Sequence, residues 1–463
     1  MADVLLTHGY FLLEDPKEQE IMKPYPTLGL LYLSAYLRRE GFTVEVFDTT
    51  FARREDLYRR LAGEPGGVVG FYTNLMTRGP VLAAIAQAKE HGWTVVLGGP
   101  ESANYPARYL EHGADVVVVG EGEVTMSELL PALAERGTHR LHDVDGVVFR
   151  DEAGEVITTP ERAQVPDLDS LPWPDRGQID IDRYVDTWRT HHGDGSVNLI
   201  TARGCPYRCR WCSHAVYGFT HRRRSPRGSA DELEHILERY RPDMVWYADD
   251  VFTIHHRWLF DYSAELDRRG IRIPFETISR ADRLMKDEVL ETLAKMGCSR
   301  IWIGSESGSQ KILDSMERRV TVEQVQWATR AAQRHGIKVG MFLMWGYEGE
   351  TLEDIEATVE HVKKSLPDVY FTTVAYPIMN TKYYERVADQ VVMTRDWAEG
   401  TDRDFVVRGR HSRRYYSFAD RWLRSAVEAA RIGGDDPEKA AALRAEAAQA
   451  RAGLAAAAHE VEA

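Results

Sequence analysis

The chain has 463 residues, an ordinary apolar content of 43% and a formal net charge of −14. This length exceeds one ordinary hydrophobic core and predicts two or three domains. The negative charge argues against nucleic acid as a general partner. No apolar run is long enough to span a bilayer, and the N-terminus begins as a strand without a targeting segment. Four cysteines, three of them clustered, argue against a disulfide scaffold and predict a reducing cytoplasmic location.

The first 130 residues alternate short β-branched runs with helical patterns. Strands are expected at 4–7, 43–47, 67–72, 94–97 and 115–119, and helices at 28–39, 80–91 and 123–135. This alternation predicts a doubly wound, Rossmann-like α/β domain that binds ligands at the carboxyl ends of its strands. Suggestive turns follow three of these strands: Thr73-Asn74, Gly98-Gly99-Pro100-Glu101 and Gly120-Glu121-Gly122-Glu123. Glycines there would let a large flat ligand approach the backbone, whereas the lack of GxGxxG after the first strand disfavours a dinucleotide.

A second alternating series follows a hairpin and a connector. Residues 144–158 are expected to form the hairpin, and a proline-rich stretch after it marks the best domain boundary. Six further strands are expected at 197–202, 244–247, 274–277, 300–303, 338–344 and 369–374, each followed or preceded by a helical pattern. They predict a (β/α)6 partial barrel with its site at the carboxyl ends of the strands. The expected domains are therefore 1–140 (Rossmann-like), 141–194 (hairpin and linker), 195–385 (partial barrel) and 386–463 (helical C-terminal region).

Three cysteines stand directly after the first strand of this second series. The segment is Cys205-Pro206-Tyr207-Arg208-Cys209-Arg210-Trp211-Cys212. Three thiolates can hold three irons of a [4Fe–4S] cluster and leave the fourth iron open for chemistry. The alternative is zinc, but zinc sites usually add a second CxxC or a histidine pair, and only His214 is nearby. The spacing therefore favours the cluster, and the isolated Cys298 is expected to be a small buried residue.

The cysteine segment, placed within six β/α units, resembles the radical S-adenosylmethionine (SAM) superfamily. With a doubly wound domain ahead of it, the chain resembles the cobalamin-binding subclass, over roughly residues 1–390. Segments 247–252, 279–282, 303–309 and 346–351 agree with that resemblance. The resemblance implies an enzyme in which Cys205, Cys209 and Cys212 hold a [4Fe–4S] cluster and SAM fills the open iron. A reduced cluster would then cleave SAM to a 5′-deoxyadenosyl radical, with the electron supplied by a flavodoxin- or ferredoxin-type donor.

The resemblance also assigns cofactor contacts residue by residue. For SAM it implies Trp211 against the adenine, Asp249 and Asp250 near the methionyl ammonium, and Glu306 and Arg280 for the ribose and carboxylate. Packing under the cluster is a compatible role for Trp211, and a structural salt bridge is an almost equal alternative for Arg280. For cobalamin it implies the turns at Thr73, Asn74, Gly98, Gly99, Pro100, Gly120, Glu121 and Gly122.

One departure concerns the cobalt. No Asp-x-His-x-x-Gly string occurs, and His8 and His112 fit neither its spacing nor its position. Cobalamin would therefore lack the histidine ligand that this motif supplies, which suits methyl transfer to a carbon radical.

Three functions follow from these features. The leading hypothesis is methylation of an unactivated carbon of a small molecule. The chain also resembles the anaerobic magnesium-protoporphyrin monomethyl ester cyclase group, so an oxidative cyclase or hydroxylating enzyme is the alternative. A non-catalytic cobalamin- or metal-binding protein is disfavoured because all three cysteines are intact. The basic runs at 221–224 and at Arg408, Arg410, Arg413 and Arg414 are expected to be solvated faces, with binding of a substrate phosphate or carboxylate as the alternative.

Overall fold

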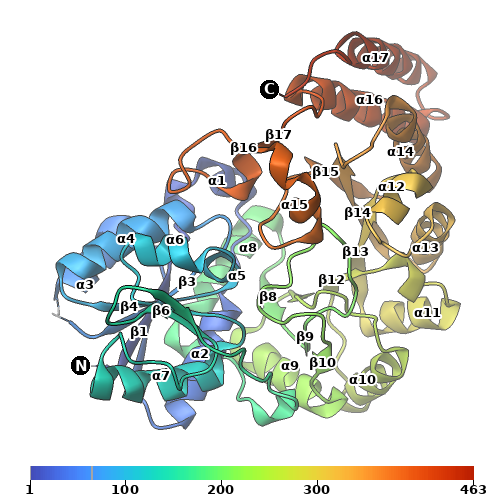
Figure 1. The fold of residues 1–463 in the computed structure, drawn as a ribbon. Helices are drawn as coiled ribbons and strands as arrows, with labels where there is room; N and C mark the ends of the chain where they lie inside the picture. Colours follow the sequence, from blue (N-terminus) through green and yellow to red (C-terminus); the bar gives the residue numbers. More distant parts are fainter. Residues whose placement is uncertain (1, 64–65, 463) are drawn as a thin grey trace. The chain divides into compact units, whose positions relative to one another are not determined.

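The computed structural model describes residues 2–63 and 66–462, and these divide into two compact units. Unit 1 comprises residues 1–206, 213–246 and 395–402. Unit 2 comprises residues 207–212, 247–394 and 403–463. Each unit is therefore assembled from segments that are far apart in the sequence. Figure 1 colours the chain by its position in the sequence.

The first sheet lies in unit 1 and has seven strands in the order β2-β1-β3-β4-β5-β6-β7. Its parallel part consists of β1 (Val4–His8), β2 (Val44–Phe47), β3 (Val68–Tyr72), β4 (Thr94–Gly98) and β5 (Val116–Val118). The order 2-1-3-4-5 defines a doubly wound sheet whose strand order reverses beside β1, where ligands of such sheets bind. The predicted Rossmann-like domain is confirmed.

Helices bury both faces of this sheet. They are α2 (Leu28–Arg39), α3 (Arg54–Gly63), α4 (Arg78–Glu90), α5 (Pro100–Asn104), α6 (Pro106–Glu111) and α7 (Gly122–Arg136), with the short α1 (Pro16–Ile21) ahead of them. Branched strand residues such as Val4, Leu6 and Val96 form one core with Leu37 of α2 and Leu129 of α7. Burial of this apolar surface fixes the strands and so positions the loops at their carboxyl ends.

The predicted hairpin is confirmed and belongs to the same sheet. Strands β6 (Val147–Arg150) and β7 (Val156–Thr158) pair antiparallel with each other, and β6 pairs antiparallel with β5. The connector after it contains a helix that the sequence interpretation did not include, α8 (Ile181–His192). Its N-cap Asp180 accepts a hydrogen bond from the Arg183 backbone at 3.1 Å, and Tyr184 and Trp188 are buried along one face.

The second sheet has the strand order β15-β14-β13-β12-β11-β8, and the boundary between the two units falls within β11. Its strands are β8 (Ser196–Leu199), β11 (Met244–Tyr247), β12 (Phe275–Ser279), β13 (Cys298–Glu306), β14 (Lys338–Trp345) and β15 (Val369–Val374). Within unit 2, β12 to β15 are parallel neighbours. The intervening helices are α9 (Pro226–Tyr240), α10 (His256–Arg269), α11 (Asp287–Met296), α12 (Gln310–Ser315), α13 (Val322–Arg334) and α14 (Leu352–Ser365). This alternation confirms the predicted parallel β/α series.

The C-terminal part of unit 2 is mainly helical, as expected. It contains α15 (Lys382–Val387), the antiparallel pair β16 (Val391–Met393) and β17 (Phe405–Val407), and the helices α16 (Arg413–Ile432) and α17 (Pro437–Ala456). Helices α16 and α17 lie side by side (Figure 1). Trp422 and Leu454 from them join Leu343 of β14 and Ile355 of α14 in one core. None of the described helices has the length and apolar character needed to cross a membrane.

Candidate cofactor site

The predicted turns after β3 and β4 lie together at the carboxyl edge of the first sheet. Gly99 has φ +103°, and a Cβ there would lie 2.3 Å from the carbonyl oxygen of Thr73, so only glycine fits. The Thr73 hydroxyl donates to the Gly98 carbonyl at 3.0 Å and accepts from the Ser102 backbone at 2.9 Å. The Asn74 side chain accepts a backbone hydrogen bond in the turn that leads into α4. These residues therefore hold the loop edge in place.

Gly98, unlike Gly99, has open space next to its backbone that a ligand could occupy. A Cβ added at Gly98 would meet no described atom within 4 Å, so space is open above this backbone. Pro100 begins α5, which pre-organises the turn that follows. Gly120 follows β5 with φ +88°, a conformation that glycine adopts without strain. The edge thus has a backbone surface that a flat ligand can approach.

Glu121, predicted at this edge, is buried and bonded to arginines. Its two oxygens accept from Arg203 at 2.8 Å and from Arg222 at 2.7 Å, and the Val165 backbone donates at 2.9 Å. Burial raises its pKa, but the hydrogen bonds and charges of Arg222 and Arg203 outweigh burial and lower the pKa of Glu121 below its usual value. The carboxylate therefore has a structural role inside unit 1.

Arg203 was not singled out from the sequence, yet it lies at the centre of this network. It also pairs with Glu123, at 2.5 Å, and its guanidinium lies 5.0 Å from the ring centroid of Tyr32. Arg224 is buried as well, and donates to the Leu171 carbonyl at 3.2 Å. The expectation that the basic run at 221–224 is a solvated face was therefore wrong, because its arginines pair with carboxylates and carbonyls inside the unit.

A second buried ionic cluster lies at the start of α4. Arg78 donates to Glu101 at 2.6 Å and to Asp402 at 2.8 Å, and the Tyr105 hydroxyl donates to Asp402 at 2.7 Å. One guanidinium thus faces two carboxylates. Burial and the Asp402 charge raise the pKa of Glu101 to about 7, even though Arg78 opposes that rise.

His8 ends β1, beside the point where the strand order reverses. Its Nε2 lies 2.9 Å from an Asp48 oxygen, and its Nδ1 lies 2.9 Å from the Thr49 hydroxyl. The imidazole is also nearly inaccessible to solvent. Both ring nitrogens of His8 therefore have protein partners within unit 1.

The cysteine segment is a loop that leaves β9 (Ala202–Arg203) and returns at β10 (Arg222–Arg223), two short strands that pair antiparallel. Cys205 belongs to unit 1, whereas Cys209 and Cys212 belong to unit 2. Among the described residues, no three His, Cys, Asp or Glu side chains are grouped around a single ion position.

Two buried arginines of unit 2 face the Cys209 sulfur. Arg318 places Nη1 at 3.1 Å from Sγ, and Arg280 places Nη1 at 3.9 Å. The Arg280 guanidinium also lies over the Tyr207 ring, 3.7 Å from its centroid. Arg280 was predicted from the sequence, but Arg318 was not. Burial opposes its charge, but Glu306 and the thiolates of Cys209 and Cys212 raise the pKa of Arg318.

Glu306, predicted to meet the SAM ribose, ends β13 in a left-handed conformation with φ +54°. Its Oε1 lies 3.4 Å from Nε of Arg318, and its buried Oε2 has no hydrogen-bond partner among the described residues. Burial raises the pKa of Glu306 despite Arg318 and Arg280. A buried oxygen without a partner is costly, so this acceptor is suited to a ligand hydroxyl.

The other predicted SAM residues also lie in unit 2. Asp249 is buried and Asp250 exposed just after β11. Desolvation by the surrounding protein and the Asp249 charge raise the pKa of Asp250 to about 6. Trp211 packs against the core that contains Met344 and Tyr347, and its buried indole N–H has no protein partner in the described structure. The structure thus brings Arg280 and Glu306 together around Arg318.

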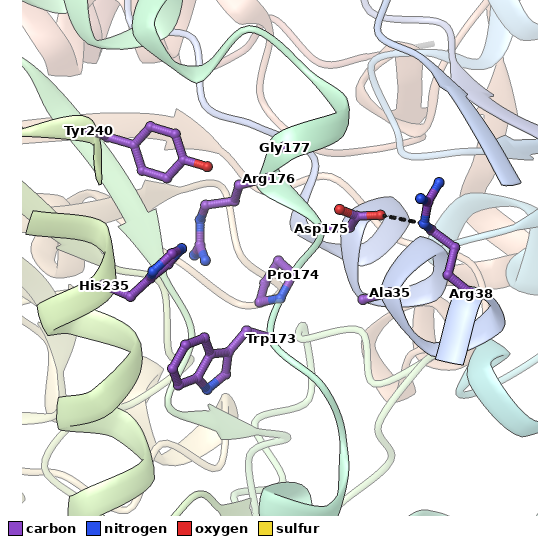
Figure 2. Close-up of a pocket in the computed structure, with 9 residues that line it drawn as sticks. All are labelled: Ala35, Arg38, Trp173, Pro174, Asp175, Arg176, Gly177, His235 and Tyr240. Atoms are coloured by element: carbon purple, nitrogen blue, oxygen red, sulfur yellow. Dashed lines mark ion pairs between the residues drawn. The ribbon is translucent and has the colours of Figure 1, made fainter. Parts of the chain in front are cut away.

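A surface pocket of about 410 Å³ in unit 1 is distinct from these residues. Figure 2 shows Trp173, His235 and Tyr240 around it, with Arg176 between them and the Arg38–Asp175 ion pair to one side. Arg176 is neutralised by Glu232 at 2.7 Å. None of the predicted cofactor residues lines this pocket.

Comparison with known families identifies both domains. Residues 20–130 match the B12 binding domain, and residues 199–362 match the radical SAM superfamily. The chain therefore has a B12-binding domain followed by a radical SAM domain. The predicted family is confirmed.

Curated relatives cover most of the chain. An uncharacterized methyltransferase of Pyrococcus horikoshii is 28% identical over 83% of this chain and 84% of its own length. The anaerobic magnesium-protoporphyrin IX monomethyl ester cyclase of Rubrivivax gelatinosus is 25% identical over 80% of this chain and 68% of its own length. The hopanoid C-3 methylase of Methylococcus capsulatus is 27% identical over 80% of this chain and 70% of its own length.

Solved structures share the fold. The radical SAM methyltransferase TsrM of Kitasatospora setae superposes with a TM-score of 0.69 and 21% identity, over 84% of this chain and 75% of that one. The cobalamin-dependent SAM radical enzyme OxsB gives a TM-score of 0.74 and 19% identity, over 97% and 71%. At these identities the likeness establishes the architecture alone.

Family membership brings three cofactors: a [4Fe–4S] cluster, SAM and cobalamin. The residues present fit them. Two arginine donors face the Cys209 sulfur, Trp211 and Glu306 offer buried polar atoms without protein partners among the described residues, and open space lies above Gly98. Cys205, Cys209 and Cys212 are the residues that would hold the cluster.

Proposed function

We propose that the protein methylates an unactivated carbon of a small molecule. The observation that carries this proposal is the presence, on one chain, of a B12-binding domain and a radical SAM domain whose cysteine segment is complete. Two of its curated relatives are named as methyltransferases or methylases. When bound, the cluster and SAM supply a radical that removes hydrogen from carbon, and cobalamin supplies a methyl carrier.

The chain's own residues would bind and orient these groups. Glu306 offers Oε2 to a ribose hydroxyl, and the indole of Trp211 offers a flat surface and a buried N–H to adenine. Asp249 and Asp250 offer carboxylates to the SAM ammonium. Arg280 uses Nε for Asp282 at 2.9 Å and Nη2 for the Arg318 carbonyl at 2.6 Å, so its main contribution would be to hold this loop.

At the first sheet, the turns at Thr73-Asn74, Gly98-Gly99-Pro100 and Gly120-Glu121-Gly122 would form the cobalamin edge. The hydrogen bonds of Thr73 to Gly98 and Ser102 join the ends of β3 and β4 and hold this edge rigid. The glycines keep the edge flat. A flavodoxin- or ferredoxin-type protein of a reducing cytoplasm would deliver electrons. The domain limits proposed from the sequence, 1–140, 141–194, 195–385 and 386–463, remain part of this proposal.

An oxidative cyclase is the second candidate. The relative that favours it is the Rubrivivax gelatinosus cyclase, which aligns with four-fifths of the chain. The two reactions add different atoms to the product, so they can be separated by mass.

The test compares small-molecule extracts of a strain that lacks the gene with the same strain complemented by the wild type or by Cys209→Ala. We expect a product, present only with the wild type, that is heavier than its precursor by one methyl group. With methyl-deuterated SAM, the purified enzyme should transfer the label to the same product. A gain of oxygen or a loss of hydrogen instead would reject methylation in favour of the cyclase class.

A further inference from the structure

The guanidinium of Arg318 is anchored at one end and directed at a cluster ligand at the other. It follows α12, is 6% exposed, and donates through Nη2 to the Gly304 carbonyl at 2.7 Å. Glu306 lies 3.4 Å from its Nε. Its Nη1 lies 3.1 Å from the Cys209 sulfur, within the range of an N–H···S hydrogen bond. The hydrogen bond to the Gly304 carbonyl and the ion pair with Glu306 hold the guanidinium, so Nη1 is directed at the Cys209 sulfur.

Arg280 reinforces this arrangement from the neighbouring strand end. It donates to the backbone carbonyl of Arg318 at 2.6 Å and stacks on Tyr207, two residues before the second cysteine-segment thiol at Cys209. The backbone that carries Arg318 is therefore tied to the cysteine loop. Of the two arginine contacts to the Cys209 sulfur, the hydrogen bond from Arg318 is shorter than the contact from Arg280.

We propose that Arg318 is a positioning residue for the cluster: it holds the Cys209 thiolate and makes the cluster easier to reduce. Hydrogen bonds to the cluster sulfurs and nearby charges set the reduction potentials of iron–sulfur centres. Groups that hydrogen-bond to the ligands orient those ligands and tune the metal site. Reduction adds one electron to the cluster and changes no bond, so a buried cation beside a ligand favours the reduced form. This proposal depends on the radical SAM site and is independent of methyl transfer.

The neighbouring residue provides a matched control. Arg319 is also an arginine, but it is exposed. Substitution of Arg319 removes the same charge from the surface without removing a donor from Cys209. Arg318→Lys keeps the charge at the buried position but loses the planar fork that reaches both the Gly304 carbonyl and the sulfur.

The experiment is a potentiometric titration of the anaerobically reconstituted full chain with dithionite, without SAM, followed by the EPR signal of the reduced cluster. Iron is quantified in each variant. We expect Arg318→Gln to disfavour reduction about tenfold, which for a one-electron couple is a midpoint about 59 mV lower. Arg318→Lys should fall between Arg318→Gln and the wild type, and Arg319→Gln should match the wild type.

An Arg318→Gln protein with full iron content and the wild-type midpoint overturns the proposal, as does an equal shift in Arg319→Gln. If Arg318→Gln takes up no cluster, Arg318→Lys decides, because an unshifted midpoint in that variant also overturns it. A purely structural role would change iron content or thermal stability without moving the midpoint. Failure of the methylation test leaves this measurement intact, since no substrate is present.

Discussion

The guanidinium of Arg78 donates to the carboxylate of Asp402 at 2.8 Å, although 324 residues separate the two in the chain. Both side chains are fully buried within unit 1. Arg78 also donates to the carbonyls of Trp397 and Gly400, at 3.2 and 3.0 Å. Residues 395–402 are thereby part of unit 1, because they supply acceptors for a cation that α4 buries.

Replacement of Arg78 by Met should destabilise unit 1 by about 3–5 kcal/mol, because two buried carboxylates lose their cation. Hydrogen exchange measured by mass spectrometry should show faster exchange in peptides of β3 and β4. Arg59→Met, at an exposed arginine of α3, is the control and should change protection by less than about 0.5 kcal/mol. Equal protection in the two variants would contradict the structural role given to Arg78.

Glu101 should make stability depend on pH in an identifiable direction. Burial and Asp402 raise its pKa to about 7 from an ordinary value of 4.5. Between these values the folded protein holds a proton that the unfolded chain has lost, so stability falls as pH rises from about 4.5 to above 7. The wild type should therefore lose thermal stability relative to Glu101→Gln between pH 5.5 and pH 8. Glu111→Gln, at an exposed position of α6, should show a constant difference across this range.

Cluster binding should depend on Cys209 and not on Cys298. Cys209→Ala is expected to lose most of its bound iron after anaerobic reconstitution and to stop cleaving SAM on reduction. Cys298→Ala should retain about four irons per chain, because Cys298 is buried at the start of β13, where burial raises the pKa of its thiol. Iron content, visible absorbance and 5′-deoxyadenosine are the measurements. A Cys209→Ala protein with normal SAM cleavage would overturn the assignment.

Two adjacent glycines should separate folding from cobalamin binding. Gly99→Ala places a methyl group 2.3 Å from the Thr73 carbonyl in a conformation that disfavours side chains, so it should cost more than about 2 kcal/mol of stability. Gly98→Ala meets no described atom, so it should leave the unfolding midpoint unchanged. If cobalamin lies against this edge, Gly98→Ala should weaken cobalamin binding by about tenfold, or about 1.4 kcal/mol, in absorbance titrations. Unchanged binding would place the corrin elsewhere.

Helices and strands could be predicted from the sequence where the local residue pattern agrees with the burial of those residues in the fold. Strand β15 and helix α2 have the predicted bounds because an unbroken run of β-branched and aromatic residues and an apolar helical periodicity are local signals. The arginines Arg203 and Arg318 could not be found this way, since a charged residue in a loop or a two-residue strand resembles a solvated one until its partners are known. The same holds for Asp402, whose role depends on Arg78 rather than on its neighbours in the sequence. The sequence therefore predicted the chemistry of the cysteine segment, but it did not predict the buried ionic contacts of Arg203, Arg318 and Asp402.

Because unit 1 includes residues 395–402, its folding can be completed only late in the synthesis of the chain. A ribosome makes the chain from its N-terminus, and domains generally fold as they emerge. Here the last segment of unit 1 is residues 395–402, so the Arg78 cation lacks three of its acceptors until that segment has left the exit tunnel. The B12-binding part of the chain therefore reaches its final form only after the whole radical SAM match, residues 199–362, has been made.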